Sequence, residues 1–168
     1  KMSDIFFHRN RLGFIAGESI VMSRAGEFFK FFPETVTTIL DSDPIDVNVS
    51  HVKVSNLRHA IPFAEELLLF SDQTQFVMSG ANILTPSNIV INATTEFESS
   101  LDAKPVSAGR NVFFAFNKGN FTGVREYISQ PGVAIKDASD ITIHIPEYIT
   151  SSVYKMAVSS NEDVLVLV

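Results

Sequence analysis

The chain has 168 residues, of which 45% are hydrophobic and 19% charged, enough apolar material for the core of one ordinary domain. It contains no cysteine, which excludes disulfides, thiolate zinc sites and thiol catalysis. No apolar run reaches the roughly 18–20 residues of a membrane span, and the N-terminus lacks a signal-peptide layout, so we expect neither a span nor a secretory leader. The net charge of −6 argues against a surface that grips phosphate backbones.

The composition favours β structure. Fifteen phenylalanines accompany only three tyrosines and no tryptophan, and valine, isoleucine and threonine are abundant. Four short apolar strands each follow a small polar turn, and their first residues are 47, 45 and 52 positions apart. These strands are Ile20–Ser23, Leu67–Ser71, Val112–Phe116 and Val164–Val168.

Each of these strands has predicted neighbours. Before the turn lies another strand, at 11–15, 59–63, 105–108 and 156–159 in the four units. In the first three units a third strand follows, at 28–31, 75–78 and 123–127, and then a fourth, at 35–40, 88–92 and 140–145. In the last of these, Ile141, Ile143 and Ile145 recur at period two, which predicts one apolar face.

Units of four antiparallel strands with apolar central strands, repeated at this period, are typical of the blades of a β-propeller. The alternative is an ordinary β-sandwich with evenly spaced hairpins. The linking segments near residues 41–58 and 128–139 are expected to be irregular insertions. One short helix near Ser50–Arg58 is compatible with the spacing of Val54, Leu57 and Ile61.

The sequence stops inside the strand Val164–Val168, directly after a turn. A hairpin of two strands buries little and leaves an open apolar edge. We therefore expect residues 1–168 to be a single propeller portion, about three blades plus the start of a fourth, belonging to a longer chain. The alternative is that the terminal strand pairs with the N-terminal one.

No motif with chemical function stands out, and no catalytic, cofactor-binding or metal-binding residue is expected. The histidines at positions 8, 51, 59 and 144 lack metal-ligand spacing and are interpreted as structural. The acidic run Asp41–Asp46 lacks the glycine and the bidentate glutamate of a calcium loop, so it is interpreted as a solvated loop between strands. Nucleophile-elbow and phosphate-binding motifs are absent from the sequence.

Two further runs have structural interpretations. Gly119–Gly123 is predicted to form a hairpin turn, with glycine supplying a positive φ. Glu27–Phe32 could be an aromatic patch for sugars or membranes, but a strand would place Phe29 and Phe31 on one face and Phe28, Lys30 and Phe32 on the other. We expect core packing on at least one of these faces and consider an oligomer contact on the other.

Three stretches together resemble the nozzle proteins of short-tailed phages, also called tail tubular protein B. They are Asp4–Phe14 followed by Met22–Phe29, Leu67–Phe76 leading to Leu84-Thr85-Pro86, and Pro105–Phe114 followed by Phe121–Tyr127. The resemblance implies a non-enzymatic structural component of the virion tail, built around an irregular β-propeller with inserted domains. It also implies a hexameric ring at the distal end of the tail, below the adaptor protein.

The same resemblance implies the partners. They would be other copies of the chain, the tail adaptor protein, the tail fibres, and phage DNA that passes through the channel without specific binding. An acidic protein suits such a channel, because a basic wall would hold DNA rather than pass it. The alternative function is a carbohydrate-binding or polysaccharide-degrading propeller module acting on the host surface, and a third is a cellular propeller for protein interaction.

Overall fold

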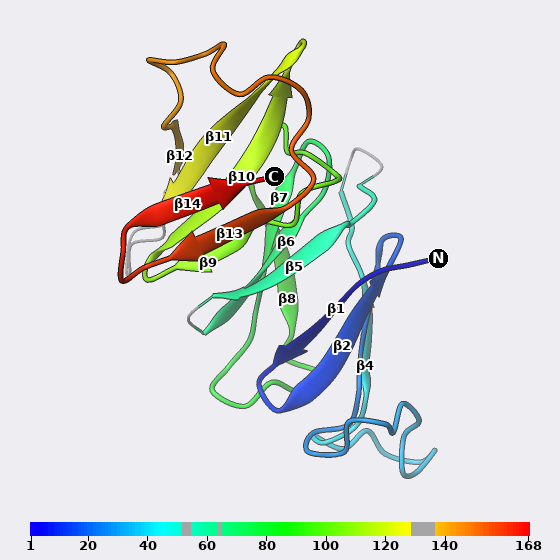
Figure 1. Cartoon of the computed structure of the whole chain (residues 1–168). Helices are drawn as coiled ribbons and strands as arrows, with labels where there is room; N and C mark the ends of the chain where they lie inside the picture. Colours follow the sequence, from blue (N-terminus) through cyan, green and yellow to red (C-terminus); the bar gives the residue numbers. More distant parts are fainter. Residues whose placement is uncertain (52–54, 64, 129–136) are drawn as a thin grey trace. The chain divides into compact units, whose positions relative to one another are not determined.

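The computed structural model describes residues 1–51, 55–63, 65–128 and 137–168, and these form β-strands, turns and loops without a helix (Figure 1). The described strands assemble into three four-stranded sheets and one two-stranded sheet, all antiparallel where the register is defined. The predicted all-β class with consecutive four-stranded antiparallel sheets is therefore confirmed. Among the described residues, no helix has the length and apolar character of a bilayer-spanning segment.

Each sheet is built from strands that are consecutive in the chain. Sheet 1 contains β1 (Met2–His8), β2 (Arg11–Ala16), β3 (Ser19–Met22) and β4 (Ile45–Asn48). Sheet 2 contains β5 (His59–Phe63), β6 (Glu66–Phe70), β7 (Gln75–Ser79) and β8 (Val90–Thr95). Sheet 3 contains β9 (Val106–Ala108), β10 (Asn111–Lys118), β11 (Phe121–Ile128) and β12 (Asp137–Asp140), and sheet 4 contains β13 (Met156–Ser159) and β14 (Val164–Leu167).

The chain divides into two compact units. Unit 1 comprises Lys1–Ser71 and Gln75–Ala93, with sheets 1 and 2, and unit 2 comprises Asp72–Thr74 and Thr94–Val168, with sheets 3 and 4. In unit 1 one apolar core joins the two sheets, because Ile15, Ile20 and Met22 of sheet 1 belong to the same buried cluster as Leu69 and Met78 of sheet 2. This sharing of one core by successive sheets is the packing that adjacent blades require.

The core of unit 2 is smaller. Ala115 and Val124, which pair across β10 and β11, are buried with Ala103, Val153 and Met156. Leu165 and Leu167 of β14 pack against this cluster and are only partly buried. Sheet 4 thus contributes to the core of unit 2 through Met156 of β13 and through two alternate residues of β14.

Most predicted strands are present, with bounds that differ from the prediction by at most three residues, but the strand at 28–31 and the strand at 35–40 are wrong. The N–H groups of Glu27 and Lys30 donate to carbonyls three residues earlier, at 3.2 and 3.1 Å, so the chain turns repeatedly here. Pro33 also lacks the N–H that a ladder needs. The edge of β3 is instead paired with β4, after a long loop of residues 23–44, called here the β3–β4 loop.

The predicted strand at 140–145 is also wrong. β12 ends at Asp140, whose carboxylate accepts hydrogen bonds from both the N–H and the hydroxyl of Thr142, at 2.8 and 2.7 Å. This local bonding competes with a sheet ladder, and the chain goes into turns. Ile141, Ile143 and Ile145 are all exposed, so the predicted apolar face does not form a core contact.

Three other expectations concern the first strand, the predicted helix and the last strand. The first strand, β1, was not among the strands expected from the repeat, although it contains the run Ile5-Phe6-Phe7. In the proposed helix, Ser50, His51 and residues 55–58 are not helical, and residues 52–54 lie outside the described residues. The terminal strand β14 pairs with β13.

The turns at two hairpins use left-handed backbone conformations. Gly119 has a φ of 64° in the β10–β11 turn, which confirms the predicted hairpin, whereas Gly123 lies within β11 and has no positive φ. The β1–β2 turn has no glycine, and Arg9 and Asn10 take φ values of 45° and 59°. Two successive residues with positive φ are the requirement of a type I′ hairpin turn, which asparagine tolerates and arginine seldom adopts.

A phenylalanine lies over a glycine of the facing strand in both of these hairpins. Phe6 pairs with Gly13, and Phe116 pairs with Gly123. A Cβ built on Gly13 would lie 2.4 Å from Cζ of Phe6, and one on Gly123 would lie 2.4 Å from Cζ of Phe116. The glycines are therefore required because the aromatic ring occupies the place of a side chain.

We predict that Gly13→Ala lowers the free energy of unfolding by about 1–3 kcal/mol, because the added methyl group overpacks the Phe6 ring. Urea unfolding would measure the loss, with the exposed Ser3→Ala as the control on the same strand pair. The loss should shrink when Phe6 is also changed to leucine, since the clash is with the ring. An equal loss in both backgrounds would contradict this explanation.

Candidate interaction surface

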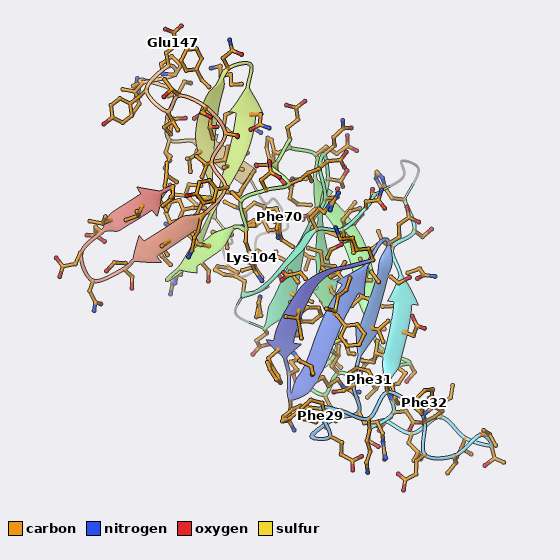
Figure 2. The ribbon with its side chains drawn as sticks, turned by 45° about the vertical axis from the view of Figure 1, so that its right-hand side comes forward. Phe29, Phe31, Phe32, Phe70, Lys104 and Glu147 are labelled. Atoms are coloured by element: carbon orange, nitrogen blue, oxygen red, sulfur yellow. The ribbon has the colours of Figure 1, made fainter. Side chains whose placement is uncertain are left out.

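The β3–β4 loop carries the most exposed large apolar side chains of unit 1 (Figure 2). Phe28 packs edge-on against Phe7 of β1, with ring centroids 5.3 Å apart, and Phe31 packs against Phe14 of β2, at 4.9 Å. Phe29 and Phe32 are directed to solvent. The predicted strand alternation is therefore replaced by a turn in which the first and third aromatic residues of the run, Phe28 and Phe31, contact sheet 1.

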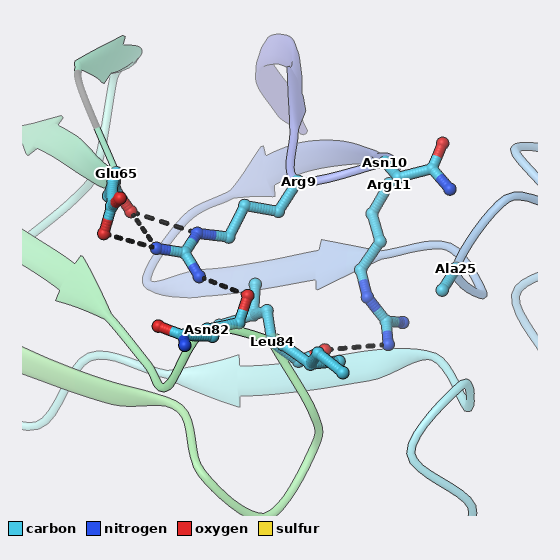
Figure 3. A pocket seen from close by; sticks show the side chains of 8 residues that line it. Arg9, Asn10, Arg11, Ala25, Glu65, Asn82 and Leu84 are labelled. Atoms are coloured by element: carbon cyan, nitrogen blue, oxygen red, sulfur yellow. Dashed lines mark hydrogen bonds and ion pairs between the residues drawn. The ribbon is translucent and has the colours of Figure 1, made fainter.

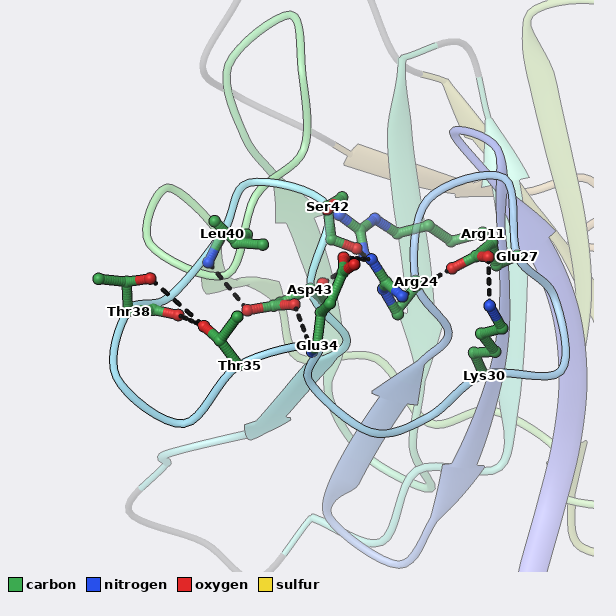
Figure 4. A network of polar contacts seen from close by, with 10 residues as sticks. All are labelled: Arg11, Arg24, Glu27, Lys30, Glu34, Thr35, Thr38, Leu40, Ser42 and Asp43. Carbon is green, nitrogen blue, oxygen red and sulfur yellow. Dashed lines mark hydrogen bonds and ion pairs between the residues drawn. The ribbon is translucent and has the colours of Figure 1, made fainter.

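A network of ion pairs holds the first half of this loop (Figure 4). The guanidinium of Arg24 pairs with the carboxylate of Glu27 at 2.8 Å and with that of Glu34. Lys30 pairs with the other oxygen of Glu27 at 2.6 Å, and this hydrogen bond lowers the pKa of Glu27. The two cations and two of the carboxylates of the loop are thus neutralised within the loop itself.

Asp43 organises the second half of the loop. Its carboxylate accepts hydrogen bonds from the backbone N–H groups of Leu40, at 2.8 Å, and Glu34, at 3.3 Å. The side chain is buried, so the interpretation of the acidic run as a solvated loop is wrong at this position. Asp41 and Asp46 are exposed, and Asp46 lies on β4. The carboxylate of Asp43 therefore satisfies two backbone donors that precede it in the loop.

Arg11 connects this loop to the body of unit 1. Its side chain is fully buried and donates to the carbonyls of Ser23 at 2.8 Å, Asp43 at 2.6 Å and Asp41 at 2.8 Å. A fourth bond, to the carbonyl of Leu84 at 3.1 Å, reaches the segment between β7 and β8 (Figure 3). Burial lowers the pKa of Arg11, and nearby Asp43 partly opposes this. An arginine nevertheless stays charged, so Arg11 is a buried cation whose acceptors are backbone carbonyls.

Arg9, in the β1–β2 turn, also connects sheet 1 to segments next to the strands of sheet 2. Its guanidinium donates to the carbonyls of Glu65, at 2.8 and 3.1 Å, of Ala81 at 2.6 Å and of Asn82 at 3.0 Å. Arg9 and Arg11 both line a pocket of about 590 Å³ in unit 1, and Figure 3 shows Arg9 reaching Glu65 in the β5–β6 turn and both arginines reaching the segment between β7 and β8, at Asn82 and Leu84. These N–H groups bind protein backbone, so the pocket's cations serve to join the two sheets.

The histidines lie on separate elements. His8 is buried at the end of β1, and the ring of His51 packs edge-on against Phe76 at 5.6 Å. His59 begins β5, and His144 is exposed in the segment after β12. Within the described ranges, no group of three or more histidine, aspartate and glutamate side chains is placed to hold a metal ion.

We predict that Arg11→Met lowers the free energy of unfolding by about 3 kcal/mol or more, because it leaves several buried carbonyls without a donor. Lys30→Met, which removes an exposed ion pair, should leave the unfolding midpoint nearly unchanged. Urea unfolding would measure both variants. Limited proteolysis should in addition cut the β3–β4 loop faster in Arg11→Met, and equal cutting rates would argue against the anchoring role.

We predict that His8 contributes to acid sensitivity. Burial, assisted by the charge of Arg9, lowers the pKa of His8 from 6.5 to about 4 in the folded state. Between pH 6.5 and pH 4, His8 is protonated in the unfolded chain but not in the folded chain. The free energy of unfolding therefore does not depend on His8 protonation above pH 6.5, and it decreases as the pH falls through this window. Urea midpoints of the wild type and of His8→Gln should differ by a constant amount above pH 6.5. The wild type should lose more than the variant below it, and parallel curves would contradict the assignment.

Comparison with known proteins agrees with the resemblance noted in the sequence. A family model described as bacteriophage nozzle protein matches residues 1–168. The tail tubular protein gp12 of Escherichia phage T7 is 42% identical to this chain over 163 residues, which are 96% of this chain and 20% of gp12. The chain therefore spans about one fifth of the length of this curated relative. Because the family model covers every residue, the chain belongs to the bacteriophage nozzle protein family.

Proposed function

We propose that the protein containing this chain is a non-enzymatic structural component of a short-tailed phage tail, where it forms part of the ring around the DNA exit channel. The observation that carries the proposal is the match to the nozzle family over the whole chain, together with the T7 tail protein as a relative. A place in the tail of a virion follows from the same matches.

Within this proposal the four sheets are successive blades of an irregular β-propeller, three of them with four strands and one represented by two. The shared core of sheets 1 and 2 supports this arrangement, because a blade buries its apolar face against the next blade. Residues 1–168 would then be one propeller portion of a longer chain. A hexameric ring, a contact with the adaptor protein and a contact with the tail fibres complete the proposed assembly.

The charges of the chain support passage of DNA without specific binding. Of the six arginines, Arg9, Arg11 and Arg24 donate to backbone or carboxylate oxygens of the protein. The guanidinium of Arg125 lies over the rings of Phe97 and Phe116, at 4.6 and 4.4 Å from their centroids. Guanidinium groups engaged in this way are not displayed for phosphate, and the net charge of −6 repels a polyanion.

We predict that the full-length protein forms rings with six-fold symmetry, alone or on its adaptor, in electron micrographs. In a gel-shift assay at physiological salt the protein should not retard double-stranded DNA, because residues 1–168 have a net charge of −6. A protein that stays monomeric with its adaptor present would contradict the proposal. Shortening of host polysaccharide by a protein that forms no ring would favour the carbohydrate-active alternative instead.

A further inference from the structure

The tip of the β3–β4 loop is an apolar surface without a cover in the described part of unit 1. Four side chains form it: Phe29, Phe32, Val36 and Ile39 are 90%, 83%, 99% and 79% exposed. Four large apolar side chains are thus exposed within the eleven residues 29–39, and exposed apolar groups gathered in this way mark binding surfaces.

The loop holds this surface in a defined place. Arg11 fixes its base through the carbonyls of Ser23 and Asp43, and Asp43 fixes the return segment through two backbone N–H groups. The N–H of Ala25 also donates to the carbonyl of Ser42 at 3.1 Å, which joins the two ends of the loop. A surface that is already ordered loses less conformational entropy when a partner binds.

The charge of the loop restricts the kind of partner. Residues 23–44 contain two cations, Arg24 and Lys30, and four carboxylates, which makes a net charge of −2. Both cations are paired within the loop. An anionic lipid surface or DNA would be repelled, and neither would find a free cation on this loop. The remaining apolar side chains fit a protein surface.

A second exposed apolar surface lies in unit 2, in the segment that follows β12. Ile141, Ile143, Ile145 and Tyr148 are all exposed there. This segment is also held in place: the N–H of Thr122 donates to the carbonyl of Ile149 at 2.9 Å, and the hydroxyl of Thr122 donates to the carbonyl of Ser151 at 2.7 Å. A ring contact joins two different surfaces of the same chain, one from each neighbour. The chain therefore has apolar surface for both sides of such a contact.

We propose that the apolar tip of the β3–β4 loop, formed by Phe29, Phe32, Val36 and Ile39, docks onto a neighbouring copy of the same protein. The inference rests on the proposed ring. Each partner buries roughly 800 Å² in a standard interface, so the tip would be one part of a larger contact. The two phenylalanines would act as its anchors, since a few buried large side chains dominate interface energy.

The first test uses the full-length protein with the double change Phe29→Ser and Phe32→Ser. We expect the concentration needed for ring formation to rise tenfold or more in sedimentation velocity, with the unfolding midpoint of the subunit unchanged. Thr37→Ser, at an exposed polar position of the same loop, is the control and should assemble like the wild type. Unchanged assembly of the double variant would overturn the inference. So would a lowered unfolding midpoint, because the tip would then be covered by its own chain.

The second test identifies the occupant. A photo-crosslinking benzoylphenylalanine replaces Val36 in the full-length protein, and the cross-linked peptides are identified by mass spectrometry. We expect cross-links between two copies of the chain that depend on protein concentration, and none from the same group placed at the exposed Lys118. Cross-links within one chain, or only to a different tail protein, would overturn the inference.

Ring formation by the wild-type protein distinguishes a failure of this inference from a failure of the proposed function. If it forms no ring under any condition, the proposed function fails before the variants are compared. If the wild type forms rings and the double variant forms them equally well, the proposed function stands and only the role of the loop is wrong.

Discussion

The buried guanidinium of Arg11 is the interaction on which the organisation of unit 1 depends. It projects from β2 of sheet 1 and donates to carbonyls of the β3–β4 loop, at Ser23 and Asp43, and of the segment between β7 and β8, at Leu84. A buried cation is costly unless its donors are satisfied, so the loop must return to the same place to supply acceptors. The long loop is thereby an ordered part of the unit, although it has no strand of its own.

The consequences of this constraint extend to the loop surface. Hydrogen bonds of Arg11 and Asp43 to backbone groups hold the base of the loop. The loop is therefore ordered without burial of the apolar side chains at its tip. Phe28 and Phe31 cover sheet 1, and Phe29 and Phe32 remain exposed. A run of aromatic residues is thus divided between partly buried rings that contact sheet 1 and rings exposed to solvent, and the core packing expected for this run is wrong.

The two hairpins with an aromatic ring over a glycine show a second constraint. In each, the phenylalanine precedes the glycine by seven residues and faces it across the strand pair, so the ring fills the space that the glycine leaves. The pairing fixes the register of both strands, because a slip of one residue would place the ring against a side chain. It occurs once in each unit, in the hairpins β1–β2 and β10–β11.

The sequence by itself determined the all-β class, the repeated units and most of the strands, since apolar runs between polar turns depend only on local burial and turn chemistry. It also carried the family resemblance, through the order and spacing of motifs such as Leu67–Phe76. Periodicity failed at 28–31 and 35–40, where the edge of β3 pairs with β4 instead, and at 140–145, where the Asp140 carboxylate bonds Thr142 and the chain turns. Only the tertiary structure decided these segments and the role of Arg11, because backbone carbonyls far apart in the chain become its acceptors only when the two sheets pack. For the same reason the buried state of Asp43 and the exposure of Phe29 and Phe32 could not be read from local pattern.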